Sequence, residues 1–229
     1  MAIIKLGALI AGIRGTIGGI TYSANKSGTY AKPWGKSSNP HSEMQSLRRG
    51  AFGIFNYTWQ NMSSALKADW DTWAALPAQA RINSLGDTYY MSGYNAFIMI
   101  QARRSSIGAV PSTTVPTGSA PTAPTLTDFV VYKTATGGSY IEYPVDEFDG
   151  LYLIAFIAAS SGEGPQVWYP DYFQVVADST PDDDVELIQT ELEAVFGTIS
   201  SDQRFFLKLH AQDSEGLRSS ATTGDCLVA

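Results

Sequence analysis

The sequence predicts an α+β protein in two parts: an N-terminal extended arm with a hairpin and a small helical region, and a C-terminal antiparallel β-sandwich. Three patterns lead to this prediction. Glycine and proline are dense over residues 1–40, apolar residues recur at helical spacing over residues 41–107, and short β-prone runs fill residues 126–229. We take residues 108–125 as a linker between the two parts.

The arm contains seven glycines and two prolines, too many breakers for a helix, in a sequence too apolar for a flexible linker. Two short β-prone runs, residues 19–22 and 29–32, flank a turn-forming stretch at residues 25–28, which predicts a β-hairpin. A two-stranded hairpin alone is at best marginally stable in water. We therefore expect the arm to need a partner that holds it.

The region after the arm has the period of α-helices. Ser42, with Gln45 three positions later, forms a capping box, and apolar residues follow it at helical spacing. A second helix begins at Ser63 or Ser64 and stops before the next proline, and a third is expected over residues 93–104. The tryptophans of the first two helices are expected to be core or interface anchors. Together the three helices form a small bundle at most.

The linker holds four prolines and no charged residue, so we expect it to run extended as a semi-rigid connector. Beyond it, several β-prone runs are separated by Gly, Asp, Ser or Pro, a spacing typical of a sandwich. These runs cover residues 129–135, 139–145, 151–159, 172–177 and 205–211. In the last run apolar and polar residues alternate, as in a strand with one buried face. Residues 185–196 fit either a strand pair or a short helix.

The charge of the chain is divided unevenly. Residues 1–110 hold 11 Lys and Arg against 4 Asp and Glu, a net charge of +7, while residues 111–229 hold 4 against 18, a net charge of −14. Such a split suits a chain whose basic half lies on an acidic partner while its acidic half faces solvent. The pattern favours an assembly component over an enzyme.

Composition excludes several classes of protein. The single cysteine, Cys226, can form neither an internal disulfide nor a cysteine-based zinc site. No run approaches the roughly 20 apolar residues that span a bilayer, so no membrane anchor is expected. The apolar run at residues 6–13 is at the short limit for a signal peptide and has no convincing cleavage site, so it is not read as one.

No catalytic, cofactor or metal site is predicted. The glycine repeat that begins at Gly12 lacks the signatures of phosphate-binding loops, and the chain has only two histidines, His41 and His210. The acidic stretch at residues 182–193 lacks a calcium-binding pattern and is interpreted as a solvated loop. Hydrolysis by a pair of carboxylates stays open, because such pairs are found only by geometry.

The basic residues of the first half interleave with aromatic ones, a pattern that also suits nucleic acid. Counterion release rewards clustered Lys and Arg, and aromatic rings stack on exposed bases. The acidic half would be repelled by the same polymer, however, and no DNA-binding motif is present. We therefore favour an acidic protein surface over nucleic acid as the partner.

Short motifs of the first half occur in a characteristic order. They are Arg14-Gly-Thr-Ile-Gly-Gly-Ile-Thr-Tyr, Gly28-Thr-Tyr-Ala-Lys-Pro, Ser38-Asn-Pro-His-Ser-Glu-Met-Gln-Ser-Leu-Arg-Arg, and Trp59 with Leu66 to Trp73. In this order, residues 12–104 resemble a group of tailed-bacteriophage virion structural proteins with a glycine-rich arm, a similar helix start and paired tryptophans. The C-terminal part resembles a fibronectin type III or related immunoglobulin-like domain, especially at residues 204–219, although the tryptophan of an early strand is missing.

The resemblance implies a non-enzymatic virion protein, assembled in the host cytoplasm, that contacts the major capsid protein or tail and connector proteins and forms a homo-oligomer in the particle. We expect capsid decoration first, with the basic part docked and the acidic sandwich projecting. A tail, connector or fibre-base adaptor is the alternative. A carbohydrate-binding or hydrolytic host-surface module, using Trp168, Tyr169 and Tyr172, is the alternative of another class. The residues expected to make the docking contact are Arg14, Tyr22, Tyr30, Lys32, Trp34, Arg48 and Arg49.

Overall fold

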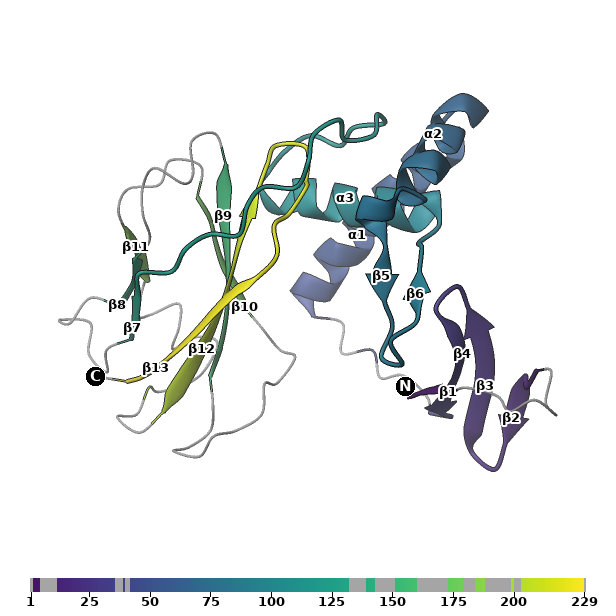
Figure 1. Cartoon of the computed structure of the whole chain (residues 1–229), viewed down its shortest axis with the longest axis horizontal. Coiled ribbons are helices and arrows are strands. Elements are labelled where there is room, and N and C mark those ends of the chain that lie inside the picture. Colours follow the sequence, from purple (N-terminus) through teal and green to yellow (C-terminus); the bar gives the residue numbers. More distant parts are fainter. Residues whose placement is uncertain are drawn as a thin grey trace. The chain divides into compact units, whose positions relative to one another are not determined.

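The computed structural model describes residues 2–4, 12–35, 39, 42–131, 139–142, 151–159, 173–178, 184–187, 199 and 203–228. These residues form three α-helices and several antiparallel sheets, which confirms the α+β class (Figure 1). The chain divides into two compact units. The first unit comprises Met1–Ala102 and Pro111–Val115, and the second comprises Arg103–Val110 and Pro116–Ala229.

The first unit begins with a four-stranded antiparallel sheet of order β1-β4-β3-β2. Its strands are β1 (Ala2–Ile4), β2 (Gly15–Ile17), β3 (Ile20–Asn25) and β4 (Gly28–Pro33). The predicted hairpin is present, because β3 and β4 pair from Ile20 opposite Pro33 to Asn25 opposite Gly28.

A second hairpin, which the sequence analysis did not predict, joins β2 to β3. Ile17 pairs with Ile20, so the turn between them has only two residues, Gly18 and Gly19. Both have positive φ, 56° and 80°, as the tight turn that suits the twist of a hairpin requires. Part of the glycine repeat is thus explained by the fold of this sheet.

The three helices begin and end close to where the sequence predicts them. Helix α1 (Glu43–Asn61) is capped by Ser42, whose hydroxyl accepts a hydrogen bond from the Gln45 amide at 3.3 Å. Helix α2 (Ser64–Ala74) is capped in the same way by Ser63, and α3 (Gly93–Ser106) is the third helix. Between α2 and α3 lie a short 3-10 helix (Pro77–Gln79) and a small hairpin, β5 (Arg81–Ile82) with β6 (Thr88–Tyr89).

The core of the first unit surrounds Trp70. This side chain is fully buried, and its ring lies 5.3 Å from Phe97 and 5.7 Å from Trp73, both edge-on. Trp59 of α1 adds a third contact, 5.4 Å from Phe97. The helices can approach this closely because α3 starts with Gly93, where a Cβ atom would lie only 2.6 Å from the backbone nitrogen of Asp71.

The first part of the predicted linker is bound to this helical core. The buried side chain of Gln101 donates to the Ser112 carbonyl at 2.7 Å and accepts from the Ser112 amide at 3.0 Å. The indole nitrogen of Trp70 donates to the Thr113 carbonyl at 2.9 Å. Because prolines in this stretch cannot donate, side chains of the helices supply the partners that its backbone needs.

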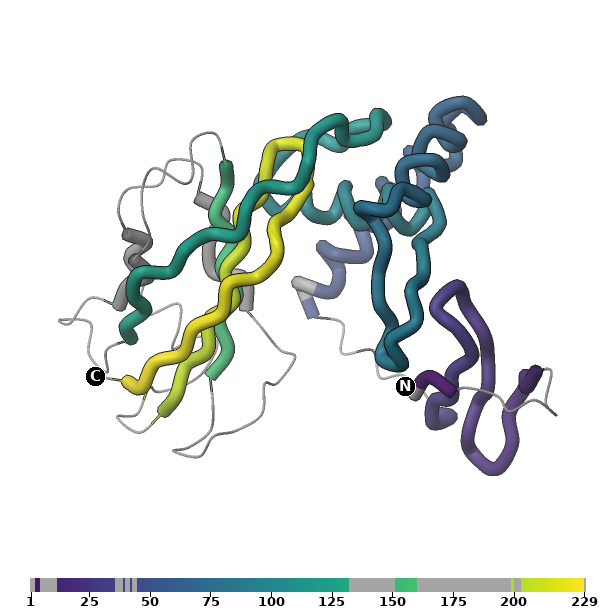
Figure 2. Tube along the Cα trace, viewed as in Figure 1, coloured from purple at the N-terminus to yellow at the C-terminus, as the bar shows by residue number. Residues whose placement is uncertain are grey.

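The second unit contains two further antiparallel sheets. One has the order β10-β9-β12-β13 and the other the order β11-β8-β7. Their strands are β7 (Asp128–Val130), β8 (Ser139–Glu142), β9 (Tyr152–Ala159), β10 (Phe173–Asp178), β11 (Asp184–Leu187), β12 (Arg204–Gln212) and β13 (Thr222–Leu227). Figure 2 traces β9, β12 and β13 side by side. Of the ambiguous stretch at residues 185–196, the first part is strand β11, and the rest lies outside the described residues.

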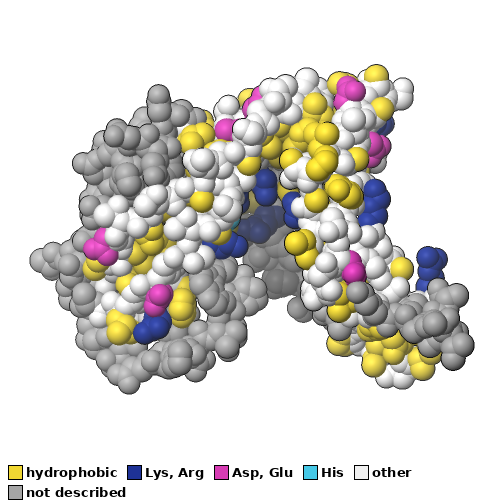
Figure 3. Space-filling view, in the orientation of Figure 1, with side chains coloured by type: hydrophobic (Ala, Val, Ile, Leu, Met, Phe, Trp, Pro, Cys, Tyr) yellow, Lys and Arg dark blue, Asp and Glu magenta, His cyan; other side chains and the backbone are white. Residues whose placement is uncertain are grey.

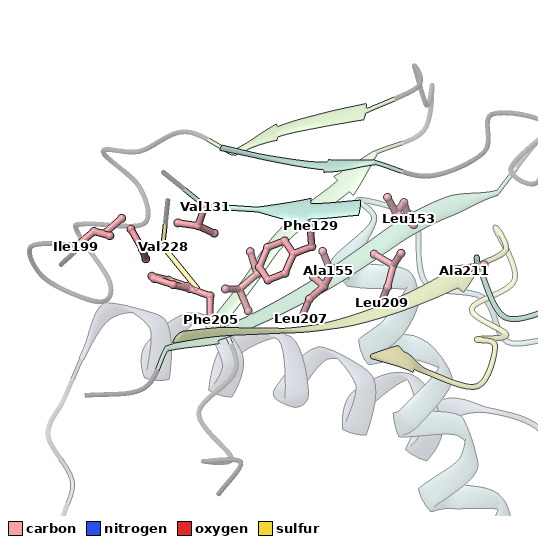
Figure 4. Close-up of a cluster of buried hydrophobic side chains, with 11 residues drawn as sticks. Phe129, Val131, Leu153, Ala155, Ile199, Phe205, Leu207, Leu209, Ala211 and Val228 are labelled. Carbon is pink, nitrogen blue, oxygen red and sulfur yellow. The ribbon is translucent and has the colours of Figure 1, made fainter. Parts of the chain in front are cut away.

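One core joins side chains from both of these sheets (Figure 4). The predicted alternation in β12 is confirmed for Phe205, Leu207, Leu209 and Ala211, which are buried, but the last residue of the strand, Gln212, is buried as well. Phe129 of β7 belongs to the same cluster, as do Leu153, Ala155 and Ile157 of β9. The later part of the linker is tied to this unit, because Glu215 accepts from the amides of Thr117 and Gly118 at 2.8 and 3.3 Å.

We expect Gly93→Ala to destabilise the first unit. The added methyl would meet the backbone of Trp70 and Asp71, which cannot move away cheaply, so we estimate a loss of about 1–3 kcal/mol in the free energy of unfolding. The control is Gly53→Ala in α1, where no atom lies within 4 Å of the added methyl. That change should stabilise by about 0.5–1 kcal/mol because alanine favours helix. Urea unfolding followed by tryptophan fluorescence measures both, and equal effects would contradict the close approach at Gly93.

We expect the second unit to lose stability as the pH falls from about 7.5 to 5.5. Burial lowers the pKa of His210 below its ordinary value of 6.5, and the nearby cations of Arg218, Lys208 and Arg103 lower it further. The unfolded chain then binds a proton at a pH where the folded chain does not, which favours unfolding. In His210→Gln this loss should be smaller, because position 210 then has no group that takes up a proton on unfolding in this range. Thermal melts across this range measure it, and an identical slope in both would exclude His210 as the cause.

Candidate docking surface

One face of the N-terminal sheet is apolar. In a sheet, residues directly opposite one another on paired strands point to the same side. The register therefore places Ile17, Ile20 and Pro33 on one face together with Tyr22 and Ala31. Among the residues of this sheet whose side chains the structure describes, the face, which we call the apolar sheet face, comprises Ile4, Gly15, Ile17, Ile20, Tyr22, Ala24, Thr29, Ala31 and Pro33. It contains no charged residue.

None of the described side chains of this sheet is buried. Ile17 is 71% exposed and Ile20 is 42% exposed, although they are directly paired across β2 and β3. Figure 3 shows hydrophobic side chains gathered over this sheet. Isolated exposed apolar residues are common on proteins, but a contiguous apolar group on a sheet whose described side chains are all unburied is typical of interaction surfaces.

The opposite face of the same sheet is mostly polar. It carries Tyr30 and Lys32 of β4 beside Ser23 and Thr21 of β3. The hydroxyls of Thr16 and Thr21 lie 3.0 Å apart on this face and form a hydrogen bond. Consequently the sheet separates residues that the sequence analysis had grouped, because Tyr22 lies on the apolar face whereas Tyr30 and Lys32 lie on the polar face.

Trp34 follows β4 directly and is 72% exposed. Its backbone amide donates to the Gly19 carbonyl at 2.6 Å, which holds this segment beside the β2–β3 turn. The indole itself remains available to a partner. A large exposed aromatic next to an apolar face is the residue type that most often dominates binding energy at protein interfaces.

The predicted arginines lie away from the strands. Arg14 precedes β2, and Arg48 and Arg49 lie in the first half of α1; all three are exposed. In the part of the chain that the structure describes, neither they nor Lys32 form an ion pair with a carboxylate. Their charges are therefore available to an acidic surface, and the structure does not gather all seven predicted residues on one face.

Sequence reasoning missed several exposed apolar residues. Ile17 and Ile20 of the sheet, and Leu47, Ile54 and Tyr57 of α1, are exposed although their side chains are large and apolar. The signal for the first pair was the Gly-Gly turn between two isoleucines, which predicts that they face each other. The helix residues carry no such local signal, because exposure depends on what packs against the helix.

The described residues contain no metal site and no activated nucleophile of the kinds considered above. No group of three or more His, Cys, Asp and Glu that could hold a metal ion occurs among the described residues. His210 is half-buried, and its Nδ1 donates to the Ser219 carbonyl at 3.0 Å. Burial raises the pKa of Cys226 to about 12, so this thiol is a poor nucleophile. His41, Trp168, Tyr169, Tyr172 and most of the acidic stretch lie outside the described residues.

No helix in the described ranges is long and apolar enough to cross a membrane. In comparisons with known proteins, no family model, curated protein or solved structure matches the chain. The candidate surface therefore rests on the register of the sheet and on the exposure of its side chains.

We expect the amides of β3 and β4 to exchange with solvent much faster than those of β12 when the chain is alone. Opening the sheet exposes no buried side chain, whereas opening β12 exposes a core, so the free energies of opening differ widely. Hydrogen exchange followed by mass spectrometry measures this difference. Protection of residues 20–33 as strong as that of residues 204–212 would show that the apolar sheet face is covered by the chain itself.

Proposed function

We propose that this chain is a structural component of a bacteriophage virion, most closely a capsid-decorating protein. Its N-terminal unit docks onto other virion proteins, and its second unit presents an acidic β domain. Two findings support this proposal: residues 12–104 resemble virion structural proteins, and most of the exposed apolar sheet face lies within the same residues. It requires no catalytic or cofactor site.

One observation supports docking above all: the apolar sheet face belongs to a sheet in which none of the described side chains is buried. Four strands with an apolar face normally gain their stability by burying that face. Here Ile17 and Ile20 stay exposed. Covering the two side chains would contribute about 1.5–3 kcal/mol for each one that becomes fully buried. A partner that covers the face would therefore both fix the sheet and be bound by it.

Charge favours the same unit as the docking part. The first unit holds 9 Lys and Arg against 4 Asp and Glu, a net charge of +5, and the exposed Lys32, Arg48 and Arg49 have no carboxylate partner among the described residues. Such cations speed association with an acidic surface and disfavour partners of the wrong charge. They add selectivity to the apolar contact.

We further propose that the second unit is an immunoglobulin-like or fibronectin type III-like sandwich. This finer assignment is supported by the shared core, in which Phe129 from one sheet packs with Leu207 and Ala155 from the other. Two antiparallel sheets joined by one apolar core are the defining feature of that architecture. A domain of this kind is stable without a partner, as a surface appendage needs to be.

A tail, connector or fibre-base position remains the second placement, because the same docking surface would serve there. The two placements differ in symmetry and not in chemistry. Cryo-electron microscopy of the intact particle distinguishes them, since a decorating protein occupies lattice positions and a tail protein lies on the unique axis.

We expect Ile17→Asn with Ile20→Asn to reduce incorporation into particles by at least about tenfold, since about 1.4 kcal/mol of lost binding energy suffices for that factor. The matched control is Thr16→Asn with Thr21→Asn, a directly paired position on the opposite face of the same two strands. Western blots of purified particles produced with each variant give the amount incorporated. Equal loss in both pairs, or normal incorporation after deletion of residues 1–40, would contradict docking through the apolar sheet face.

A further inference from the structure

Helix α1 has a line of positions, which we call the seam, whose described side chains are exposed and do not pack against the described part of its own unit. Positions 43, 47, 50, 54, 57 and 61 follow one another at alternating spacings of four and three residues over the whole of Glu43–Asn61. This is the spacing of the contact positions in a coiled coil. Within the seam Leu47 is 62% exposed, Ile54 is 58% exposed and Tyr57 is 70% exposed.

The helix packs on its own unit through a different face. Phe55 and Met62 are buried, and Trp59 contacts Tyr94 and Phe97 of α3. These residues all lie in the second half of α1. In the first half, every residue from Ser46 to Ile54 except Ala51 is exposed, so more than two turns have little packing within the described chain.

Such a half-helix is poorly stable by itself. It contains Gly50 and Gly53, and glycine is among the weakest helix formers. No atom lies within 4 Å of a Cβ built at either glycine, so neither is needed for packing inside the chain. Most helices in proteins are stabilised by packing of an apolar face. In the described part of the chain, the large apolar residues of the seam therefore have no packing partner.

The order of residues along the seam indicates what this partner is. If a second α1 lies antiparallel with position 52 at the centre, Leu47 meets Tyr57 of the second copy and Gly50 meets its Ile54. The same register brings position 43 opposite Asn61. Each large side chain thus faces either another large one or the gap left by Gly50, and each contact occurs twice. We infer that the seam of α1 binds the seam of a second copy of this chain, as an antiparallel helix pair.

Packing favours the antiparallel direction. The seam from Leu47 to Tyr57 contains no charged residue. In a parallel pair Gly50 would face Gly50, which leaves a gap at the centre. In the antiparallel pair this gap is filled, since Gly50 receives Ile54.

The expected dimer is weak. Three large side chains from each chain bury less than the roughly 1,200 Å² at the low end of stable interfaces, so we expect dissociation constants in the micromolar range or above. This inference does not depend on the proposed virion function, because it concerns the purified chain. It also uses a surface different from the apolar sheet face, so failure of one leaves the other intact.

Disulfide trapping tests the register. In a Cys226→Ala background, Leu47→Cys with Tyr57→Cys should give a covalent dimer on mild oxidation. Within one helix these positions lie about 15 Å apart, and a disulfide requires Cα atoms closer than about 7 Å, so no bond can form inside a chain. The single variant Leu47→Cys should form no covalent dimer, because in the antiparallel pair the two copies of residue 47 lie about 15 Å apart along the helix axis. Leu47→Cys with Gln60→Cys, where Gln60 lies off the seam, is the matched control.

A second measurement avoids cysteines. Sedimentation equilibrium of the natural chain should show a mass that rises from monomer to dimer with concentration. Ile54→Glu should weaken the dimer by at least about tenfold, since it places a charge in an apolar contact. Gln60→Glu should not, and circular dichroism should show both variants equally helical. A chain that stays monomeric, a dimer that survives Ile54→Glu, or crosslinking by Leu47→Cys alone would overturn the inference.

Discussion

Burial in the first unit is concentrated around Trp70, and the properties of the rest of that unit follow from this concentration. Trp70, Phe97 and Trp73 form an edge-to-face cluster, which α3 can join because Gly93 allows the backbones to touch. The buried side chains of this cluster come from α2, α3 and the second half of α1. None of the described residues before Phe55 contributes to it, and what the structure shows holding the N-terminal sheet is its backbone pairing.

The charge-free, proline-rich stretch illustrates a second constraint, the need to satisfy backbone polar groups. Prolines remove donors and prevent the stretch from joining a sheet in a regular way. Side chains serve instead: Gln101 forms a two-bond contact with Ser112, and Glu215 binds the amides of Thr117 and Gly118. The two parts of the stretch belong to different compact units. Its path is therefore specified by tertiary contacts as well as by proline.

The two exposed surfaces of the first unit are proposed to bind different partners. The apolar sheet face offers a contact to a partner protein, and the seam of α1 offers one to a second copy. If both are occupied together, a dimer presents two sheet faces at once, and the second contact forms at a high effective concentration. Weak individual contacts of this kind suit a protein that must stay soluble before assembly and bind firmly afterwards.

Local signals in the sequence determined much of this fold. Ser42 and Ser63 mark the helix starts because a serine hydroxyl at that position satisfies a free amide, and the alternation of β12 marks its buried face. The hairpin at residues 25–28 could be predicted because a turn-forming stretch there separates two short β-prone runs. Only the tertiary structure decided that Tyr22 and Tyr30 lie on opposite faces, that Gln101 binds Ser112, and that Ile54 stays exposed. Those outcomes depend on strand register and on packing between residues far apart in the chain, to which local propensity does not respond.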